Sequence, residues 1–162
     1  MWDLIGTVAR VGLAAVFLIS GGIKVADPDQ TYVAVNAYQV LPKAAVEPVA
    51  IVLPWFELAL GLLLVLGVGT RIVALLSAGL LVLFMAGVAQ AWARGLSIDC
   101  GCFGGGGDVT AEQTSYGTEL LRDAGFLVPA VWLIIRPASW LSLDRWLGRN
   151  DGVGPAGGGI ET

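Results

Sequence analysis

Long apolar blocks alternate with short polar or glycine-containing segments along this chain of 162 residues. The blocks cover residues 4–23, 49–68, 72–92 and, with a more polar start, 119–135. Each approaches the roughly 20 apolar residues with which an α-helix crosses a bilayer. The pattern predicts an all-α integral membrane protein, a bundle of four spanning helices. A signal peptide is the alternative for the first block, although Asp3 stands where such a peptide carries positive charge.

Shorter segments complete the predicted organisation. Residues 30–43 mix tyrosines and aliphatic residues with polar ones, which is typical of a short helix at the membrane surface. A tight turn at 67–71 makes the second and third blocks an antiparallel hairpin, and residues 93–118 form a glycine-rich loop before the fourth block. We expect one membrane domain over residues 1–147 and a disordered, glycine-rich tail over residues 148–162.

The composition supports a membrane protein and excludes several functions. Hydrophobic residues make up 56% of the chain and charged residues 14%, against roughly 25% charged in soluble domains. The net charge of −4 offers no basic face for nucleic acid. The chain has no histidine, which excludes imidazole metal ligands and histidine-based nucleophilic catalysis. Two cysteines are too few for a closed structural zinc site, so no metal site is predicted.

The two cysteines, Cys100 and Cys102, are separated by one glycine in the segment SIDCGCFGGGG, residues 97–107. A disulfide between them would close a very small ring, and only some backbone shapes bring two such Cα atoms within bridging distance. A bridge of this kind adds little stability and is easily reduced, which favours thiol–disulfide exchange over a structural role. Two inert cysteines and a copper(I) site are the alternatives.

Charged residues near these thiols would tune their reactivity. Asp99 would raise the pKa of the Cys100 thiol, whereas Lys24 or Arg94 would lower it if either lay close. The sequence does not decide between these effects. Lys24 ends the first block, where it is either an anchor at the membrane surface or a group that stabilises a thiolate.

Arg10 and Glu57 are ionisable residues deep within apolar blocks. Charged groups in that position are costly in hydrocarbon and are functional candidates by default. Two interpretations fit the pattern. Either Arg10 and Glu57 form a buried ion pair that fixes helix packing, or Glu57 accepts protons on a path to a quinone or to the thiols.

Charge distribution indicates the orientation in the membrane. Four spans place both termini on one side and the cysteine loop on the other. Of the nine Lys and Arg residues, five fall on the side of the termini, a small bias toward cytoplasmic termini. Disulfides also persist more readily outside the cytoplasm. We therefore expect a multi-pass protein of the inner or plasma membrane, with cytoplasmic termini and an extracytoplasmic cysteine loop.

Four motifs in a fixed order resemble those of a known family: SGGIK at residues 20–24, AYQVLP at 37–42, LPWFELALG at 53–61 and DCGCFG at 99–104. Spread over residues 4–136, the set resembles the MauE branch of the DoxX-like membrane proteins. The resemblance implies a four-helix, redox-associated membrane protein that often accompanies thioredoxin-like proteins. MauE itself is linked to maturation of periplasmic methylamine dehydrogenase, a substrate that the resemblance does not carry across. The family's matching positions here are Lys24, Glu57, Cys100 and Cys102.

These observations lead to one functional hypothesis and two alternatives. We expect a thiol–disulfide oxidoreductase that passes electrons between the Cys100/Cys102 pair and a thioredoxin-like or secreted partner. A membrane quinone or a second thiol protein would then return the pair to its starting redox state. The alternatives are a non-catalytic membrane scaffold that assembles a redox complex, and a permease for a small solute or a metal.

Overall fold

The computed structural model describes residues 2–101, 105–110 and 114–136. The predicted glycine-rich tail and Cys102 lie outside the described residues. Within the described ranges the chain forms helices and one small sheet, in this order: α1 (Trp2–Ala26), α2 (Pro28–Ala37), α3 (Lys43–Leu66), α4 (Thr70–Ala93), β1 (Ile98–Asp99), β2 (Gly107–Asp108) and α5 (Tyr116–Ile135).

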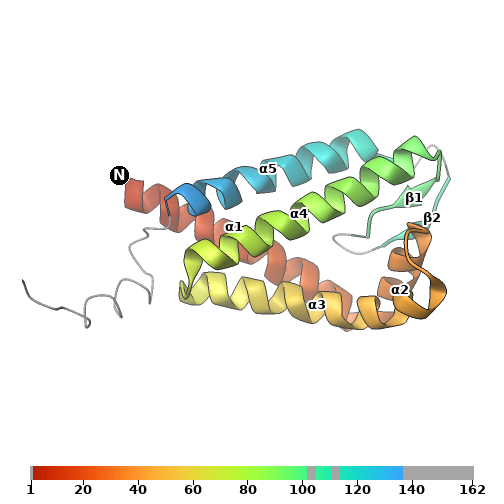
Figure 1. The fold of residues 1–162 in the computed structure, drawn as a ribbon, viewed down its shortest axis with the longest axis horizontal. Helices are drawn as coiled ribbons and strands as arrows, with labels where there is room; N and C mark the ends of the chain where they lie inside the picture. The colour runs from red at the N-terminus through yellow and green to blue at the C-terminus, as the bar shows by residue number, and fades with distance from the viewer. Residues whose placement is uncertain (1, 102–104, 111–113, 137–162) are drawn as a thin grey trace, which may run out of the picture.

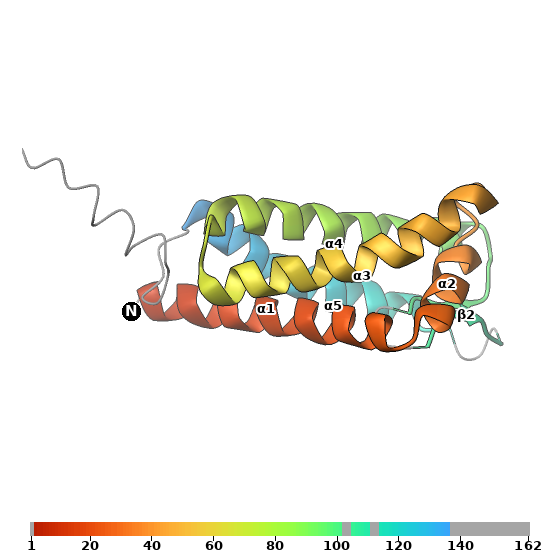
Figure 2. The ribbon, with the colours of Figure 1, turned by 90° about the horizontal axis from the view of Figure 1, so that it is seen from below.

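The four long helices lie alongside one another, and the short elements gather at one end. Figure 1 shows α2, β1 and β2 at that end, whereas the start of α1, the turn between α3 and α4 and the end of α5 lie at the other. The view from below gives the same arrangement (Figure 2). Residues of α1, α3, α4 and α5 share one apolar core. The end with α2 and the strands is called the hairpin end below.

Three of the helices, α1, α3 and α4, are long and apolar enough to cross a membrane. The sequence therefore predicted the first three blocks correctly as helices, although α3 starts earlier than expected, at Lys43. α5 is a helix of 20 residues, but Glu119, Arg122 and Asp123 in its first two turns make it less apolar than those three. The fourth membrane span stays a prediction.

α1 and α3 pack closely at two glycines. A Cβ on Gly21 would lie 2.9 Å from the carbonyl oxygen of Pro54, and a Cβ on Gly61 would lie 2.7 Å from the side chain of Leu18. The later residue of α1 faces the earlier residue of α3, so the two helices run antiparallel. Only glycine allows this separation, and it brings the polar side chains near the end of α1 against α3.

α3 and α4 are joined by the predicted tight turn. Gly67 and Gly69 have φ values of 67° and 57° there, in the left-handed region that favours glycine. From this turn the two helices diverge toward the hairpin end (Figure 1). α2 overlaps the first part of the predicted surface segment and ends at Ala37. Its first turn is capped by the Asp27 side chain, which accepts a hydrogen bond from the backbone N–H of Gln30.

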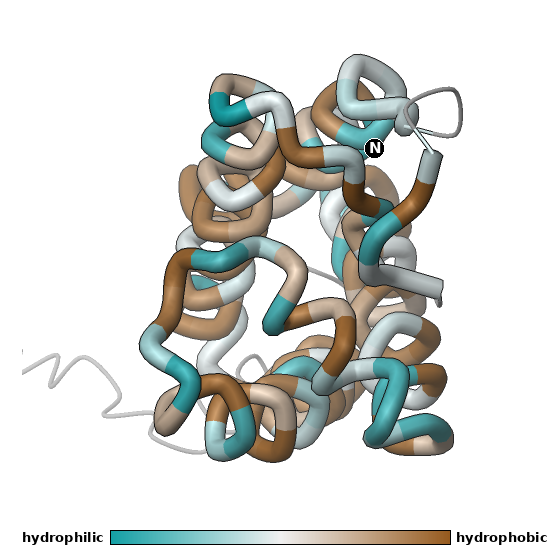
Figure 3. Tube along the Cα trace, turned by 90° about the vertical axis from the view of Figure 1, so that its right-hand side faces the viewer, coloured by the Kyte–Doolittle hydropathy of each residue, from teal (hydrophilic) through white to brown (hydrophobic). Residues whose placement is uncertain are grey.

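The cysteine loop contains a small antiparallel ladder that the sequence analysis missed. Ile98 pairs with Asp108 and Asp99 pairs with Gly107. Beneath it lies a second apolar cluster, which joins the hairpin to α2, α4 and α5. Figure 3 looks onto this end and shows hydrophilic stretches in the loops and helix ends, with mostly hydrophobic helices behind them. The described part of the loop thus forms a small hairpin that packs on the helices.

Candidate functional site

A buried ion pair joins α1 to α3 at the hairpin end. The ammonium nitrogen of Lys24 lies 2.8 and 2.9 Å from the two carboxylate oxygens of Glu57 and donates to the Ser20 hydroxyl at 2.7 Å. The same hydroxyl donates to Glu57 Oε2 at 3.1 Å. Lys24 is 8% exposed and Glu57 is fully buried. Each charged atom of this group, called the lysine cluster below, has partners, as buried charges require.

Arg10 lies elsewhere in the bundle. It is 14 positions before Lys24 in α1, which separates the two by about 21 Å along the helix at 1.5 Å per residue. The antiparallel packing places Arg10, which is 2% exposed, near the turn between α3 and α4. The interpretation that Arg10 pairs with Glu57 is therefore wrong, because Lys24 occupies that position.

Cys100 follows β1 directly and is held from both sides. The Tyr38 hydroxyl, at the end of α2, donates to the carbonyl oxygen of Cys100 at 3.0 Å. On the other side the hydroxyl of Tyr116, at the start of α5, accepts from the backbone N–H of Ile98 at 3.0 Å and donates to the carbonyl oxygen of Leu96. Two tyrosines thus fix the strand that presents the cysteine, which is 8% exposed.

Glycines allow the hairpin to lie directly on α2. Gly101 and Gly106 have φ values of 66° and 107°, and a Cβ on either would lie 2.7 or 2.5 Å from the Cβ of Ala34. The Gln30 side chain donates to the carbonyl oxygen of Gly106 at 2.6 Å. Any larger residue at these two glycines must move the hairpin away from α2, so the glycine run sets the position of Cys100.

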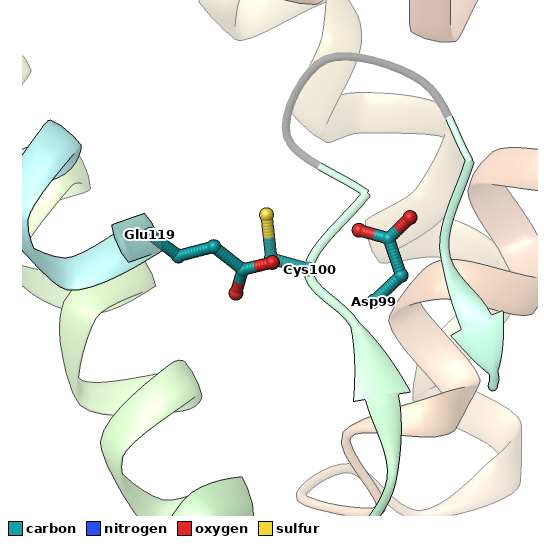
Figure 4. Close-up of side chains that lie close together, drawn as sticks. All are labelled: Asp99, Cys100 and Glu119. Carbon is teal, nitrogen blue, oxygen red and sulfur yellow. The ribbon is translucent and has the colours of Figure 1, made fainter. Parts of the chain in front are cut away.

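The Cys100 sulfur lies among charged groups. Arg122 Nη2, from the second turn of α5, is 3.5 Å from Cys100 Sγ. Ligand atoms of Asp99, Cys100 and Glu119 all lie within 4.8 Å of one another, with Glu119 and Asp99 on opposite sides of the cysteine (Figure 4). Glu119 is 9% exposed, and its Oε2 has no hydrogen-bond partner among the described residues. These four residues are called the cysteine cluster below.

The cysteine cluster suits thiol chemistry better than metal binding. The Arg122 guanidinium, which also pairs with Asp123 at 3.4 Å, favours the thiolate, the form that attacks and leaves in disulfide exchange. The carboxyl groups of Asp99 and Glu119 oppose it when they are ionised. Asp99, Cys100 and Glu119 offer three ligand atoms of the kinds that metals take. However, the positive charge of Arg122 at 3.5 Å from the sulfur opposes a second cation there.

Two predicted neighbours of the thiols have other roles. Lys24 places its charge on Glu57. The Arg94 side chain donates to the carbonyl oxygen of Gln39 and to Gln90 Oε1. Asp99 lies beside Cys100 as expected and its Oδ1 accepts from the backbone N–H of Gly101 at 3.3 Å.

The sequence analysis missed Arg122, Glu119 and Tyr116. One signal was available, because Glu119 and Arg122 are three positions apart at the polar start of a helix and such residues share a face. Nothing in the sequence placed that face against Cys100, since the hairpin that brings them together was not predicted.

Comparison with known proteins identifies similar chains. The family model described as methylamine utilisation protein MauE matches residues 2–136. The "Methylamine utilization protein MauE" of Methylorubrum extorquens is 34% identical over 110 residues, which cover 65% of this chain and 57% of that protein. The protein of the same name from Paracoccus denitrificans is 37% identical over 98 residues, which cover 60% of this chain and 53% of that protein. The chain thus spans little more than half the length of these relatives, and no solved structure matches.

Proposed function

The chain belongs to the methylamine utilisation protein MauE family, and from that premise we propose that it is a membrane thiol–disulfide exchange protein. The observation that carries the proposal is the contact of 3.5 Å between Arg122 Nη2 and the Cys100 sulfur. An ordinary buried cysteine has no need of a cation, whereas an exchange cysteine needs one to stabilise its thiolate.

The exchange step follows from the burial of Cys100. In the oxidised protein Cys100 and Cys102 share a disulfide, and a thiolate of the client attacks the sulfur of Cys102. The Cys102–client bond forms, the Cys100–Cys102 bond breaks, and Cys100 leaves as a thiolate beside Arg122. The second client thiolate then attacks the client's sulfur in the mixed disulfide, and Cys102 leaves as a thiolate. The client gains a disulfide, and its two electrons and two protons end on Cys100 and Cys102.

The residues around the sulfur support this assignment of roles. Cys100 is 8% exposed, too little for attack by a folded client, but its thiolate gains the neighbouring guanidinium. The Glu119 carboxylate, whose Oε2 has no hydrogen-bond partner, is a positioned acceptor for the proton that this sulfur gains or loses.

The membrane placement is part of the same proposal. α5 crosses the bilayer as a fourth span next to α1, α3 and α4, with its polar first turns at the membrane surface. Both termini are then cytoplasmic and the hairpin end faces the exported side, where a disulfide persists. The client is a secreted thiol protein or a thioredoxin-like partner. The relatives' names connect those proteins with methylamine utilisation, and a client from such a system is the first to examine.

The experiment is to trap the mixed disulfide. By the reverse of the step above, the Cys102 thiolate of the Cys100→Ser protein attacks the disulfide of an oxidised client. The client bonded to Cys102 can then no longer be displaced by Cys100. We expect a disulfide-linked adduct in membranes of cells with this variant, and little or none with Cys102→Ser, because only the buried Cys100 remains. The adducted client is identified by mass spectrometry after reduction.

Two results would contradict the proposal. Equal absence of adduct from both variants would show that no client attacks this pair. Full cellular function in both variants would favour the non-catalytic scaffold instead.

A further inference from the structure

A cavity of about 520 Å³ lies between α2, α3 and α4 at the hairpin end. Its volume falls within the roughly 300–1,000 Å³ typical of small-molecule sites, which are mostly apolar with a few polar groups. Most of its lining is apolar, from Val35 and Leu53 to Phe84 and Gly87, and Cys100 forms part of the wall.

The cavity extends from the outer surface to the cysteine. Val40 and Leu83 in its lining are 59% and 66% exposed, whereas Ala34 and Cys100 are 6% and 8% exposed. Its lining residues lie at the hairpin end, where α3 and α4 are farther apart than they are at their turn (Figure 1). Apolar side chains therefore line the route by which a small molecule can reach Cys100 from the surface.

The opening belongs to the part of the molecule that faces hydrocarbon. Leu53 lies within α3, and Leu83 and Gly87 lie within α4, both of which are candidate membrane spans. A charged or water-soluble reactant would have to leave water to enter between these helices, which is costly. A molecule dissolved in the bilayer would reach Cys100 without that cost.

We infer that this cavity binds a membrane quinone, which reoxidises the Cys100/Cys102 pair. The inference rests on the proposed function, since each oxidised client leaves the pair as a dithiol that needs a two-electron acceptor. In the step, the sulfur–sulfur bond forms, the two thiols lose two electrons and two protons, and the quinone takes up both to become the quinol. A quinone is lipid-soluble and carries the same number of electrons and protons.

The polar groups of the lining suit such an occupant. Buried Lys24 lines the cavity, and its ammonium group lies 5.3 Å from the centre of the Phe84 ring. Lys24 and Glu57 form an ion pair, so this part of the wall offers a quinone carbonyl a polar contact without a net charge. On the other side of the sulfur, Glu119 is placed to receive the thiol proton.

Two glycines of α4 provide a matched test. Gly87 lines the cavity, and a Cβ there would lie 3.3 Å from the Tyr38 ring. Gly79, two turns earlier in the same helix, has no atom within 4 Å of such a Cβ. Gly87→Ile therefore fills the cavity, whereas Gly79→Ile adds the same side chain to an open surface. Ala86→Trp, at an exposed lining position, blocks the opening without entering the core.

Binding of ubiquinone-1 is measured by calorimetry with the purified full chain in detergent micelles. The Cys102→Ser background is used because it keeps Cys100 in the wall but cannot reduce the quinone. We expect Gly87→Ile and Ala86→Trp each to weaken binding at least tenfold, about 1.4 kcal/mol, and Gly79→Ile to change it less than twofold. Equal binding by all three variants, or equal competition by hexadecane, would overturn the inference, the latter by showing an acyl-chain site.

Electron transfer is measured separately, without any client. The dithiol form of the unmodified protein is mixed with ubiquinone-1 under anaerobic conditions, and we expect one quinol for each disulfide formed. Binding without quinol formation would overturn the electron-transfer step. Quinol formation together with failure to trap any client would contradict the proposed exchange function and leave the quinone site supported.

Discussion

Two polar clusters lie at the same end of this molecule, and they are built differently. In the lysine cluster, Lys24 and Glu57 are within 2.9 Å of each other, and Ser20 binds both. In the cysteine cluster, Arg122 contacts the Cys100 sulfur at 3.5 Å, and one Glu119 oxygen has no hydrogen-bond partner in the part of the chain that the structure describes. The first cluster satisfies its buried charges, and the second retains proton-accepting and thiolate-stabilising capacity.

The difference teaches how to separate support from chemistry in a membrane protein with few polar residues. A buried ion pair with all partners present fixes the packing of α1 on α3. A buried carboxylate that lacks part of its hydrogen bonding lowers the stability of the fold. Such a group beside a thiol and a cation is typical of a site that carries out chemistry. The comparison therefore predicts that changes in the lysine cluster alter stability, and that changes in the cysteine cluster alter thiol reactivity.

The largest effect on stability is expected from separating Lys24 and Glu57. Lys24→Met or Glu57→Leu leaves one buried charge alone and should destabilise the protein by about 3–5 kcal/mol. The double variant replaces both charges with apolar groups and should regain most of that loss. Unfolding in a denaturing detergent titration measures all three. Single variants as stable as the parent would remove the structural role assigned to this cluster.

A smaller loss of stability is expected from Gly106→Ala. The new Cβ would lie 2.5 Å from Ala34 Cβ, and the alanine would have to adopt a positive φ. Together these effects should lower the free energy of unfolding by about 1–3 kcal/mol. Gly95→Ala is the control, because Gly95 has a φ of 67° but no atom within 4 Å of its Cβ. Thermal unfolding and the alkylation rate of Cys100 measure the outcome. If both variants behave alike, contact with α2 does not position the hairpin.

Ala34→Gly sharpens the same comparison. It removes the nearest atom that the new Cβ would meet and leaves the Cα atoms of Gly101 and Ala34 at 3.1 and 3.2 Å. Combining it with Gly106→Ala should therefore slow the alkylation of Cys100 part of the way back, although the backbone strain remains. Unchanged fast alkylation in the double variant would show that contact with the Ala34 methyl group does not displace the cysteine.

The smallest effect is expected from Arg122→Gln. The Arg122 side chain is 34% exposed, so water screens part of its charge. We expect its loss to destabilise the Cys100 thiolate by roughly 1 kcal/mol, which corresponds to about a fivefold slower reaction at neutral pH. Removing a cation raises the pKa of the thiol, so the reactivity profile should move to higher pH. Iodoacetamide alkylation in a Cys102→Ser background measures it, with Arg94→Gln as the control. Identical profiles for the two variants would exclude Arg122 as the stabilising cation.

The sequence was sufficient to predict the long helices but not the contacts between them. Apolar blocks near bilayer length have few structural alternatives, so α1, α3 and α4 were predicted from composition alone. The sequence placed Glu57 deep within an apolar block, but its partner depended on the antiparallel register of α1 and α3, where Gly21 and Gly61 allow close packing. One interpretation of the sequence paired Glu57 with Arg10, whereas Lys24 is the actual partner.

The cysteine cluster was harder to predict for a physical reason. The strands that present Cys100 have two residues each, too few for an alternating pattern. Glycines with positive φ lead into the second strand. Arg122 and Glu119 belong to a helix that starts after the loop, so only the folded hairpin brings them to the sulfur. The pair Cys100 and Cys102 was recognised from spacing, and its exchange role remains a prediction.

The central claim is tested most directly by the reduction potential of the Cys100/Cys102 pair, measured in the full chain by alkylation after equilibration with glutathione buffers. Structural disulfides have potentials below about −300 mV, and exchange proteins lie between about −270 and −120 mV. We predict a single two-electron transition within the exchange range. A potential below −300 mV, or thiols that form no disulfide with each other at any poise, would contradict the account.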